Sequence, residues 1–239
     1  MAPGRGSSLE WVAAGTRLWE TTLASLLDQA LREPSLLPGW TRAHVVAHVA
    51  LNARALGHLV SWARTGVETP MYASPQARDA DIEELAHAPA SVLRERSREE
   101  AQALAEGMDR LGEEQWQVRV RVRQGTVIAA DTLPWLRARE VFLHALDLGA
   151  GAHDRDLPEV FAHALLRDVT RQRSRVEGHP SLVLREEGGE AGWEVGRPGP
   201  EAPQVVGDVR ALAAWVSGRP VTRPVAATGG RLPQLPAWL

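Results

Sequence analysis

Apolar residues recur every three or four positions in four long segments of the first 150 residues, and this spacing predicts four amphipathic helices. The segments are residues 8–32, 41–65, 91–111 and 134–149. Thr41 and Ser91 are residue types that favour helix N-termini, and Gly66 and Gly149 can end the helices that they follow. The first part of the chain is therefore predicted to be mainly helical.

Three stretches between these helices follow other patterns. Residues 66–79 contain two prolines and little periodicity, which predicts a loop that borders a pocket, and residues 81–87 predict a short helical turn. In residues 117–130, valines alternate with arginines before a Gln-Gly turn, which predicts a β-hairpin whose arginines are exposed.

The composition changes after residue 150, where glycine and proline become frequent. Residues 158–175 predict a short helix, 181–187 and 191–196 alternate as strands do, and the run that begins at residue 204 predicts a helix from Asp208 to Gly218. The tail from residue 222 is predicted to be irregular or to form a terminal strand. We predict an α+β protein with a helical domain at residues 1–150 and a small α/β domain at residues 151–239.

Two pairs of side chains in the predicted helices suit a divalent metal. Glu140 and His144 are four residues apart, so both leave the same helical face. His44 and His48 lie one turn apart in an earlier helix. A lone histidine on an apolar face is more often a hydrogen-bonded packing residue than a ligand, but a second pair on another helix favours the metal interpretation.

A plausible ligand set is His48 with Glu140 and His144, although the spacing alone leaves His44 as a competitor of His48. Two imidazoles and one carboxylate suit zinc or another first-row divalent ion. Three protein ligands leave coordination positions open, which is typical of a catalytic rather than a structural site.

The composition excludes several kinds of chemistry. All 27 basic residues are arginine, so a Schiff-base lysine, a P-loop lysine and a lysine general base are excluded. The chain has no cysteine, so it has no disulfide and no nucleophilic thiol, and any thiol chemistry needs a thiol from a cofactor or substrate. A net charge of −3 gives no reason to expect nucleic acid as a partner.

No stretch of the sequence predicts targeting or insertion into a membrane. The N-terminus lacks the apolar core of a signal peptide, and no run of about 20 apolar residues suggests a membrane span. We expect a soluble cytoplasmic protein that acts on a small molecule, as a monomer or small homo-oligomer.

Two longer stretches carry a family resemblance. LPGWTRAHVVAHVALNARAL at residues 37–56, together with WLRAREVFLHALDLG at residues 135–149, resembles the mycothiol-dependent maleylpyruvate isomerase family of the DinB-like superfamily. The resemblance implies a DinB-like N-terminal four-helix bundle and a small C-terminal α/β domain. It also implies that His48, Glu140 and His144 bind a divalent metal, commonly zinc, and it selects His48 over His44.

The resemblance further implies a reaction. The thiol of mycothiol loses its proton near the metal, the thiolate adds to the cis double bond of maleylpyruvate, the bond rotates, and elimination of the thiol yields fumarylpyruvate. Family members contribute an arginine from the C-terminal domain, for which Arg219 is our candidate and Arg223 its competitor. An arginine suits the substrate carboxylates because its fork matches them. Asp147 either orients a metal ligand or simply finishes its helix.

Two other functions compete with the isomerase. One is mycothiol S-transfer onto another electrophile, which needs the same metal and thiol. The other is a non-catalytic helical protein that binds a metal or small ligand, for which a purely structural metal would predict four protein ligands.

Overall fold

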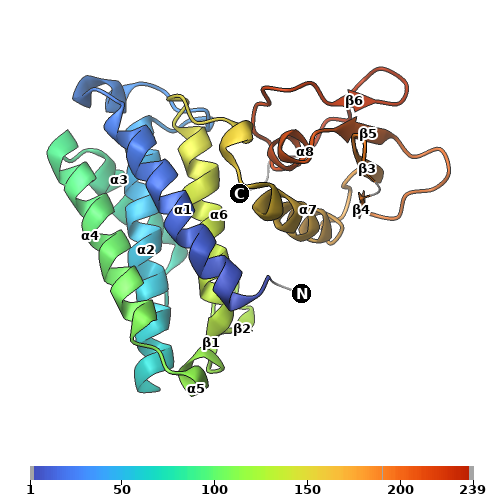
Figure 1. The fold of residues 1–239 in the computed structure, drawn as a ribbon. Coiled ribbons are helices and arrows are strands. Elements are labelled where there is room, and N and C mark those ends of the chain that lie inside the picture. Colours follow the sequence, from blue (N-terminus) through green and yellow to red (C-terminus); the bar gives the residue numbers. More distant parts are fainter. Residues whose placement is uncertain (1–2, 190, 237–239) are drawn as a thin grey trace. The chain divides into compact units, whose positions relative to one another are not determined.

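The structure, a computed structural model, describes residues 3–189 and 191–236 (Figure 1). The chain divides into two compact units, and the second begins at Ala152. The first unit is a bundle of four long helices, and the second combines helices with a four-stranded sheet. The predicted α+β class, with a helical bundle followed by a small α/β unit, is confirmed.

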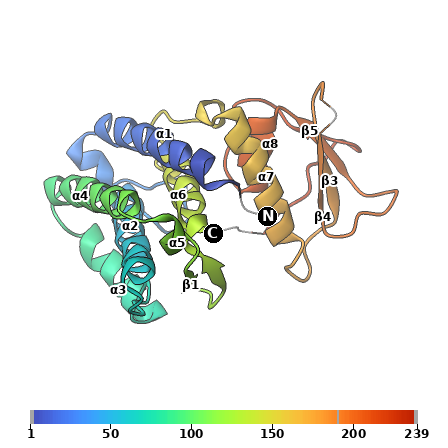
Figure 2. The same cartoon turned by 60° about the horizontal axis from the view of Figure 1, so that its bottom comes forward.

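The bundle consists of α1 (Arg5–Ala24), α2 (Arg42–Thr65), α4 (Ala90–Asp109) and α6 (Leu133–Asp147). Helix α1 packs mainly against α6, and α2 packs against both α4 and α6 (Figures 1 and 2). The shorter α3 (Pro75–Ala86) lies against α2. Because α3, α4 and α6 all pack against α2, most of its residues are buried.

Local signals fix the ends of α2. The Thr41 side chain accepts from the backbone N–H of His44, and the His44 ring faces the backbone N–H of Thr41, which makes a capping box. At the other end Gly66 has a φ of 74°, a left-handed conformation that closes the last turn with a 2.8 Å bond to the carbonyl of Trp62. Both predicted ends of this helix are confirmed.

Helix α6 is the best-packed element of the bundle core. Pro134 stands in its first turn, where a proline loses no helical hydrogen bond. Nearly all of its residues are buried, and Trp135 meets Trp11 of α1 edge-on with ring centroids 5.8 Å apart. A large apolar area therefore fixes the position of the helix that carries Glu140 and His144.

A close approach between α1 and α6 occurs at Gly15. A Cβ at this position would lie 2.5 Å from Cγ2 of Val141 and 3.0 Å from Cδ2 of Phe142, whereas one at Gly57 of α2 would meet nothing within 4 Å. Gly15→Ala is therefore expected to destabilise the chain by about 1–3 kcal/mol through overpacking. Gly57→Ala is expected to stabilise it by up to about 1 kcal/mol through helix propensity. Urea unfolding of the two variants checks the opposite signs; equal shifts would contradict this packing.

Two predicted helix boundaries in the bundle are wrong. The segment predicted as one helix over 8–32 is α1 followed by a 3₁₀ turn, η1 (Asp28–Arg32). Arg94 of α4 donates to the carbonyls of Leu23 and Leu26, so a distant side chain satisfies the end of α1. Helix α3 begins earlier than the predicted turn at 81–87, because the Ser74 side chain caps it.

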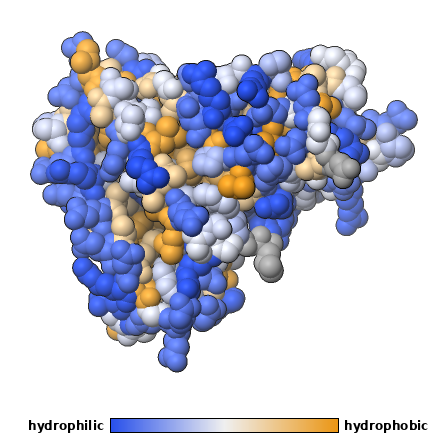
Figure 3. Space-filling view, viewed as in Figure 1, coloured by the Kyte–Doolittle hydropathy of each residue, from blue (hydrophilic) through white to orange (hydrophobic). Residues whose placement is uncertain are grey.

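Helix α4 begins one residue before the predicted cap, with Pro89 at its N-cap position. Its charged residues lie on the outward side, in agreement with the mostly hydrophilic left edge of the bundle in Figure 3. Two i,i+4 ion pairs, Arg96 with Glu100 and Arg110 with Glu106, lie along it.

The predicted hairpin forms after a short helix, α5 (Glu113–Trp116). Strands β1 (Arg119–Arg121) and β2 (Val127–Ala129) pair antiparallel, and Gly125 in the turn has a φ of 79°. A 3₁₀ turn, η2 (Ala130–Thr132), leads into α6. The arginines of β1 are exposed, as predicted.

The second unit packs helices beside a small mixed sheet. A 3₁₀ turn, η3 (Asp154–Asp156), precedes α7 (Glu159–Arg173), and α8 (Val209–Val216) packs against α7. The sheet has the order β4-β3-β5-β6. Its strands are β3 (Leu182–Glu186), β4 (Gly192–Val195), β5 (Gln204–Gly207) and β6 (Ala226–Ala227).

The helix predicted from Asp208 to Gly218 forms as α8, and the four residues before it form strand β5, which the sequence pattern did not predict. Strand β5 runs parallel to β3, and the side chain of Asp208 caps α8 at the predicted position. The tail contributes the short terminal strand β6, and its residues 237–239 lie outside the described part. None of the described helices combines the length and hydrophobicity needed to span a bilayer.

Candidate metal centre

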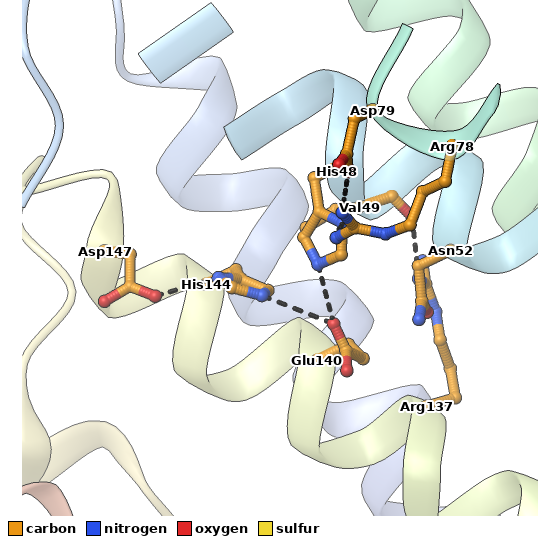
Figure 4. Close-up of polar contacts among 9 residues, drawn as sticks. All are labelled: His48, Val49, Asn52, Arg78, Asp79, Arg137, Glu140, His144 and Asp147. Carbon is orange, nitrogen blue, oxygen red and sulfur yellow. Dashed lines mark hydrogen bonds and ion pairs between the residues drawn. The ribbon is translucent and has the colours of Figure 1, made fainter. Parts of the chain in front are cut away.

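Three side chains from two neighbouring helices converge inside the bundle (Figure 4). His48 lies on α2, and Glu140 and His144 lie one turn apart on α6. Nε2 of His48 is 3.0 Å from Oε2 of Glu140, and Nε2 of His144 is 3.3 Å from the same oxygen. One ligand atom of each residue lies within 4.8 Å of the other two. Two imidazole nitrogens and a carboxylate oxygen thus face one another.

The surroundings hold both rings in fixed orientations. His48 is 8% exposed and His144 is 5% exposed. Their rings are nearly perpendicular, with centroids 4.8 Å apart, and Trp40 packs edge-on against His48 at 5.6 Å. The Nε2 atoms of His48 and His144 are therefore held in place facing Glu140.

Asp147 orients His144 from the side opposite to Glu140. Its Oδ2 is 2.8 Å from Nδ1 of His144, and the carboxylate is buried. In the neutral ring this contact keeps the proton at Nδ1 and leaves Nε2 as the ligand atom. The geometry supports an orienting role for Asp147, although the residue also ends α6.

Opposing effects set the pKa values of the three residues. Burial would raise the pKa of Glu140, but hydrogen bonds to His144 and His48 outweigh it and hold this pKa well below its usual value. Burial lowers the pKa of His48 more than the bond to Glu140 raises it. For His144, burial lowers the pKa, but the hydrogen bonds to Asp147 and Glu140 together raise it by more, so this pKa lies above the usual value of a histidine. Glu140 is therefore anionic near neutrality, and His144 keeps its proton to higher pH than an ordinary histidine.

This raised pKa predicts a pH dependence of metal binding. A metal at Nε2 must displace the proton of His144, so affinity is expected to rise with pH and to fall as pH drops below that pKa. With one proton displaced, the logarithm of the association constant should change by about one per pH unit in that range. Calorimetric titration of zinc in buffers of different ionisation enthalpy measures the released proton. An affinity that does not change between pH 6 and 8 would contradict this assignment.

Arg78 of α3 contacts the far side of His48. Its Nη2 is 3.3 Å from Nδ1 of His48, and its Nη1 donates to Asp79 at 2.6 Å. Because a guanidinium only donates, His48 accepts at Nδ1 and carries its proton at Nε2, facing Glu140. A metal at Nε2 requires the proton to sit at Nδ1, where Arg78 then finds no acceptor. Metal binding would thus free a guanidinium N–H beside the site.

Arg137 is a second cation next to the three residues, and it is 1% exposed. Its Nη1 donates to the carbonyl of Val49 at 2.8 Å and to Oδ1 of Asn52 at 3.0 Å. Its Nη2 is buried and has no hydrogen-bond partner among the described residues. Burial lowers the pKa of Arg137 to about 10, against the nearby charge of Glu140, so it stays protonated at neutral pH.

His44 takes part in other contacts. Its Nδ1 belongs to the capping box of α2, and its Nε2 is 3.1 Å from Oε2 of Glu83 on α3. The structure therefore groups His48, and not His44, with Glu140 and His144.

The three residues fit a divalent metal. Two ligand atoms about 2.0 Å from a tetrahedral zinc lie roughly 3.3 Å apart, close to the separations around Glu140 Oε2. The donor set of two imidazoles and a carboxylate matches catalytic zinc sites, and Asp147 supplies the outer contact that ligating histidines usually make.

Comparison with known proteins identifies the family. Residues 12–149 match a family model described as the mycothiol maleylpyruvate isomerase N-terminal domain. The chain belongs to the mycothiol-dependent maleylpyruvate isomerase family. The predicted membership of this enzyme family is confirmed.

Two solved structures are similar to this family member over nearly its whole length. One is the crystal structure of the mycothiol-dependent maleylpyruvate isomerase, and the other is that of a histidine-to-alanine mutant of it. Each is 33% identical, covers 99% of this chain and 98% of its own chain, and has a TM-score of 0.93. No curated protein sequence matches the chain.

The arginine that the family resemblance assigns to catalysis lies in the second unit. Arg219 follows α8, is 5% exposed, and donates from Nη1 to the carbonyl of Ser217 at 2.6 Å. Its competitor Arg223 is more exposed and forms an ion pair with Asp208 at 2.9 Å. The catalytic role of Arg219 stays a prediction, as does the metal-binding role of the three residues in the bundle.

Sequence reasoning missed Arg78 and Arg137. Arg137 precedes Glu140 by three residues and His144 by seven, so the helical face of the two proposed ligands already contained it. Arg78 lies in a stretch predicted as a loop, where no local signal indicated that it contacts His48.

Proposed function

We propose that this chain is a mycothiol-dependent isomerase that converts maleylpyruvate to fumarylpyruvate with a divalent metal, zinc in our proposal, held by His48, Glu140 and His144. The observation that carries the proposal is the convergence of these three side chains in the bundle of a chain from this family. The metal and mycothiol together would supply a thiolate at neutral pH, because a nearby dication favours the deprotonated thiol.

The residues around the centre each contribute to this chemistry. Glu140 supplies the one negative charge among the three proposed ligands, so a dication there keeps a net positive charge. Asp147 holds His144 with its Nε2 toward Glu140. The low exposure of the two histidines keeps bulk water away, which strengthens electrostatic interactions at the centre.

Arg78 and Arg137 are suited to the carboxylates of an anionic substrate. Each would present an N–H that needs an acceptor: Nη2 of Arg137 has none among the described residues, and Arg78 loses its contact with His48 when the ring binds a metal. For the buried Arg137, an N–H without an acceptor is unfavourable, and a carboxylate satisfies it through charge-assisted hydrogen bonds. Arg78 already pairs with Asp79 and would offer only its freed N–H. Arg219 is kept in the proposal as the catalytic arginine on the strength of the family resemblance.

The chain itself cannot supply the thiol, because it has no cysteine. The proposal is tested by incubating the zinc-loaded chain with maleylpyruvate, with mycothiol present, omitted or replaced by 2-mercaptoethanol. Formation of fumarylpyruvate that depends on mycothiol is the expected result. Formation at the same rate without any thiol would overturn the proposal.

The same experiment separates the competing functions. If the chain binds mycothiol but leaves maleylpyruvate unchanged, it does not act as this isomerase, and thiol transfer onto other electrophiles becomes the function to assay. If it binds metal but no mycothiol, a non-catalytic role is favoured. Both results count against the proposed isomerase.

A further inference from the structure

A short sequence around Glu140 and His144 occurs a second time in the chain. Residues 140–146 read EVFLHAL, and residues 159–165 read EVFAHAL, which differs at one position. The second copy lies in α7, where Glu159 and His163 are again one helical turn apart. The carboxylate and imidazole that meet at the first centre therefore recur on a helix of the second unit.

A third side chain joins this pair. Glu186, the last residue of β3, approaches His163, with its Oε1 3.6 Å from Nε2 of the ring. One ligand atom each from Glu159, His163 and Glu186 lies within 4.8 Å of the other two. The ligand atoms of this cluster therefore lie within the same 4.8 Å of one another as those of the first centre. The cluster has one imidazole and two carboxylates, whereas the first centre has two imidazoles and one carboxylate.

The spacing of His163 and Glu186 suits a bridging cation, although a protonated His163 would also form an ion pair with Glu186 at this distance. A separation of 3.6 Å is too long for an N–H···O hydrogen bond. It is close to the roughly 3.3 Å that separates two ligands of a tetrahedral zinc. The ring of His163 lies beside the buried Trp193 of β4, with centroids 5.5 Å apart, and its Nε2 is the nitrogen near Glu186. Arg210 contacts only one oxygen of Glu159, at a long 3.4 Å, which leaves the other oxygen for a metal.

We propose that Glu159, His163 and Glu186 form a second binding site for a first-row divalent cation, which links the start of α7 to the end of β3. The donor set of one imidazole and two carboxylates suits zinc, cobalt or manganese. The side chains of His163 and Glu186 are 26% and 20% exposed, so water reaches the site and the cation exchanges freely. Binding here is therefore weaker than at the buried centre, by about tenfold or more.

Zinc titration of the whole, tag-free and metal-free chain tests this site by its stoichiometry. Glu159→Gln and His163→Gln are each expected to bind one zinc fewer per chain than wild type. Glu177→Gln removes the same charge from an exposed position in the same unit and should keep the wild-type number. The double variant His48→Ala/His144→Ala lacks the bundle centre and should still bind one zinc per chain at the second site. Adding His163→Gln to this double variant should abolish that remaining zinc binding.

This test of the second site is independent of the proposed function, because it depends on the difference in bound zinc between wild type and variants. The total number of zinc ions bound by the wild-type chain does not enter it. Glu159 is exposed, so its variant tests the site even if His163→Gln disturbs the packing on Trp193. The inference is overturned if Glu159→Gln and His163→Gln bind as many zinc ions as wild type, or if Glu177→Gln loses the same equivalent.

Discussion

Replacing His48 by alanine is expected to weaken zinc binding at the bundle centre by more than about 100-fold, whereas His44→Ala should leave it unchanged. The reason is that Nε2 of His48 lies 3.0 Å from Glu140, while both nitrogens of His44 are engaged at the start of α2 and with Glu83. Isothermal titration with zinc in chains that also carry His163→Gln measures the change without a contribution from the proposed second site.

The two histidine variants control for each other. His44→Ala removes the capping partner of Thr41 and is expected to cost about 1 kcal/mol of stability, so a general loss of structure would affect this variant as well. The assignment of His48 is wrong if both variants keep the zinc affinity of the unsubstituted chain. It is also wrong if His44→Ala alone loses the metal.

Asp147→Asn is expected to weaken zinc binding by about 10–100-fold. The amide keeps the shape of the carboxylate but loses the charge that raises the pKa of His144 and fixes its tautomer. The pH dependence of zinc binding should move to lower pH for the same reason. Titration of the variant between pH 6 and 8 measures both effects.

This substitution also distinguishes the two roles considered for Asp147. If the residue only finishes α6, Asp147→Asn would change the free energy of unfolding and leave the zinc affinity intact. Asp156→Asn is a suitable control, because Asp156 accepts from the backbone N–H of His153 and is neither a proposed ligand nor a hydrogen-bond partner of one. If Asp147→Asn binds zinc as tightly as wild type, Asp147 does not have the orienting role.

The pairing of Glu140 with His144 could be predicted because it is local. Four residues in a helix place two side chains one turn apart whatever the tertiary structure, and the apolar spacing around them is unambiguous. The ends of α2 were predictable for the same reason, since Thr41 and Gly66 act on the backbone next to them. Periodicity alone could not bring His48 on α2 to Glu140 on α6, and only the family resemblance selected it over His44.

Other features depend on contacts between distant segments. The end of α1 is stabilised by Arg94, which lies in another helix and leaves no mark on the local periodicity. Strand β5 is four residues long and is defined by its pairing with β3, so the local pattern before Asp208 did not predict it. Arg78 meets His48 only because α3 packs on α2. Such contacts cannot be read from a single sequence pattern.

The metal-dependent mechanism is tested most directly by the rate of maleylpyruvate isomerisation as zinc is added to the metal-free chain in the presence of mycothiol. We expect almost no conversion without metal, a rise that saturates as the bundle centre fills, and no such rise for His48→Ala. Full activity of the metal-free chain, or normal zinc activation of His48→Ala, would contradict this mechanism.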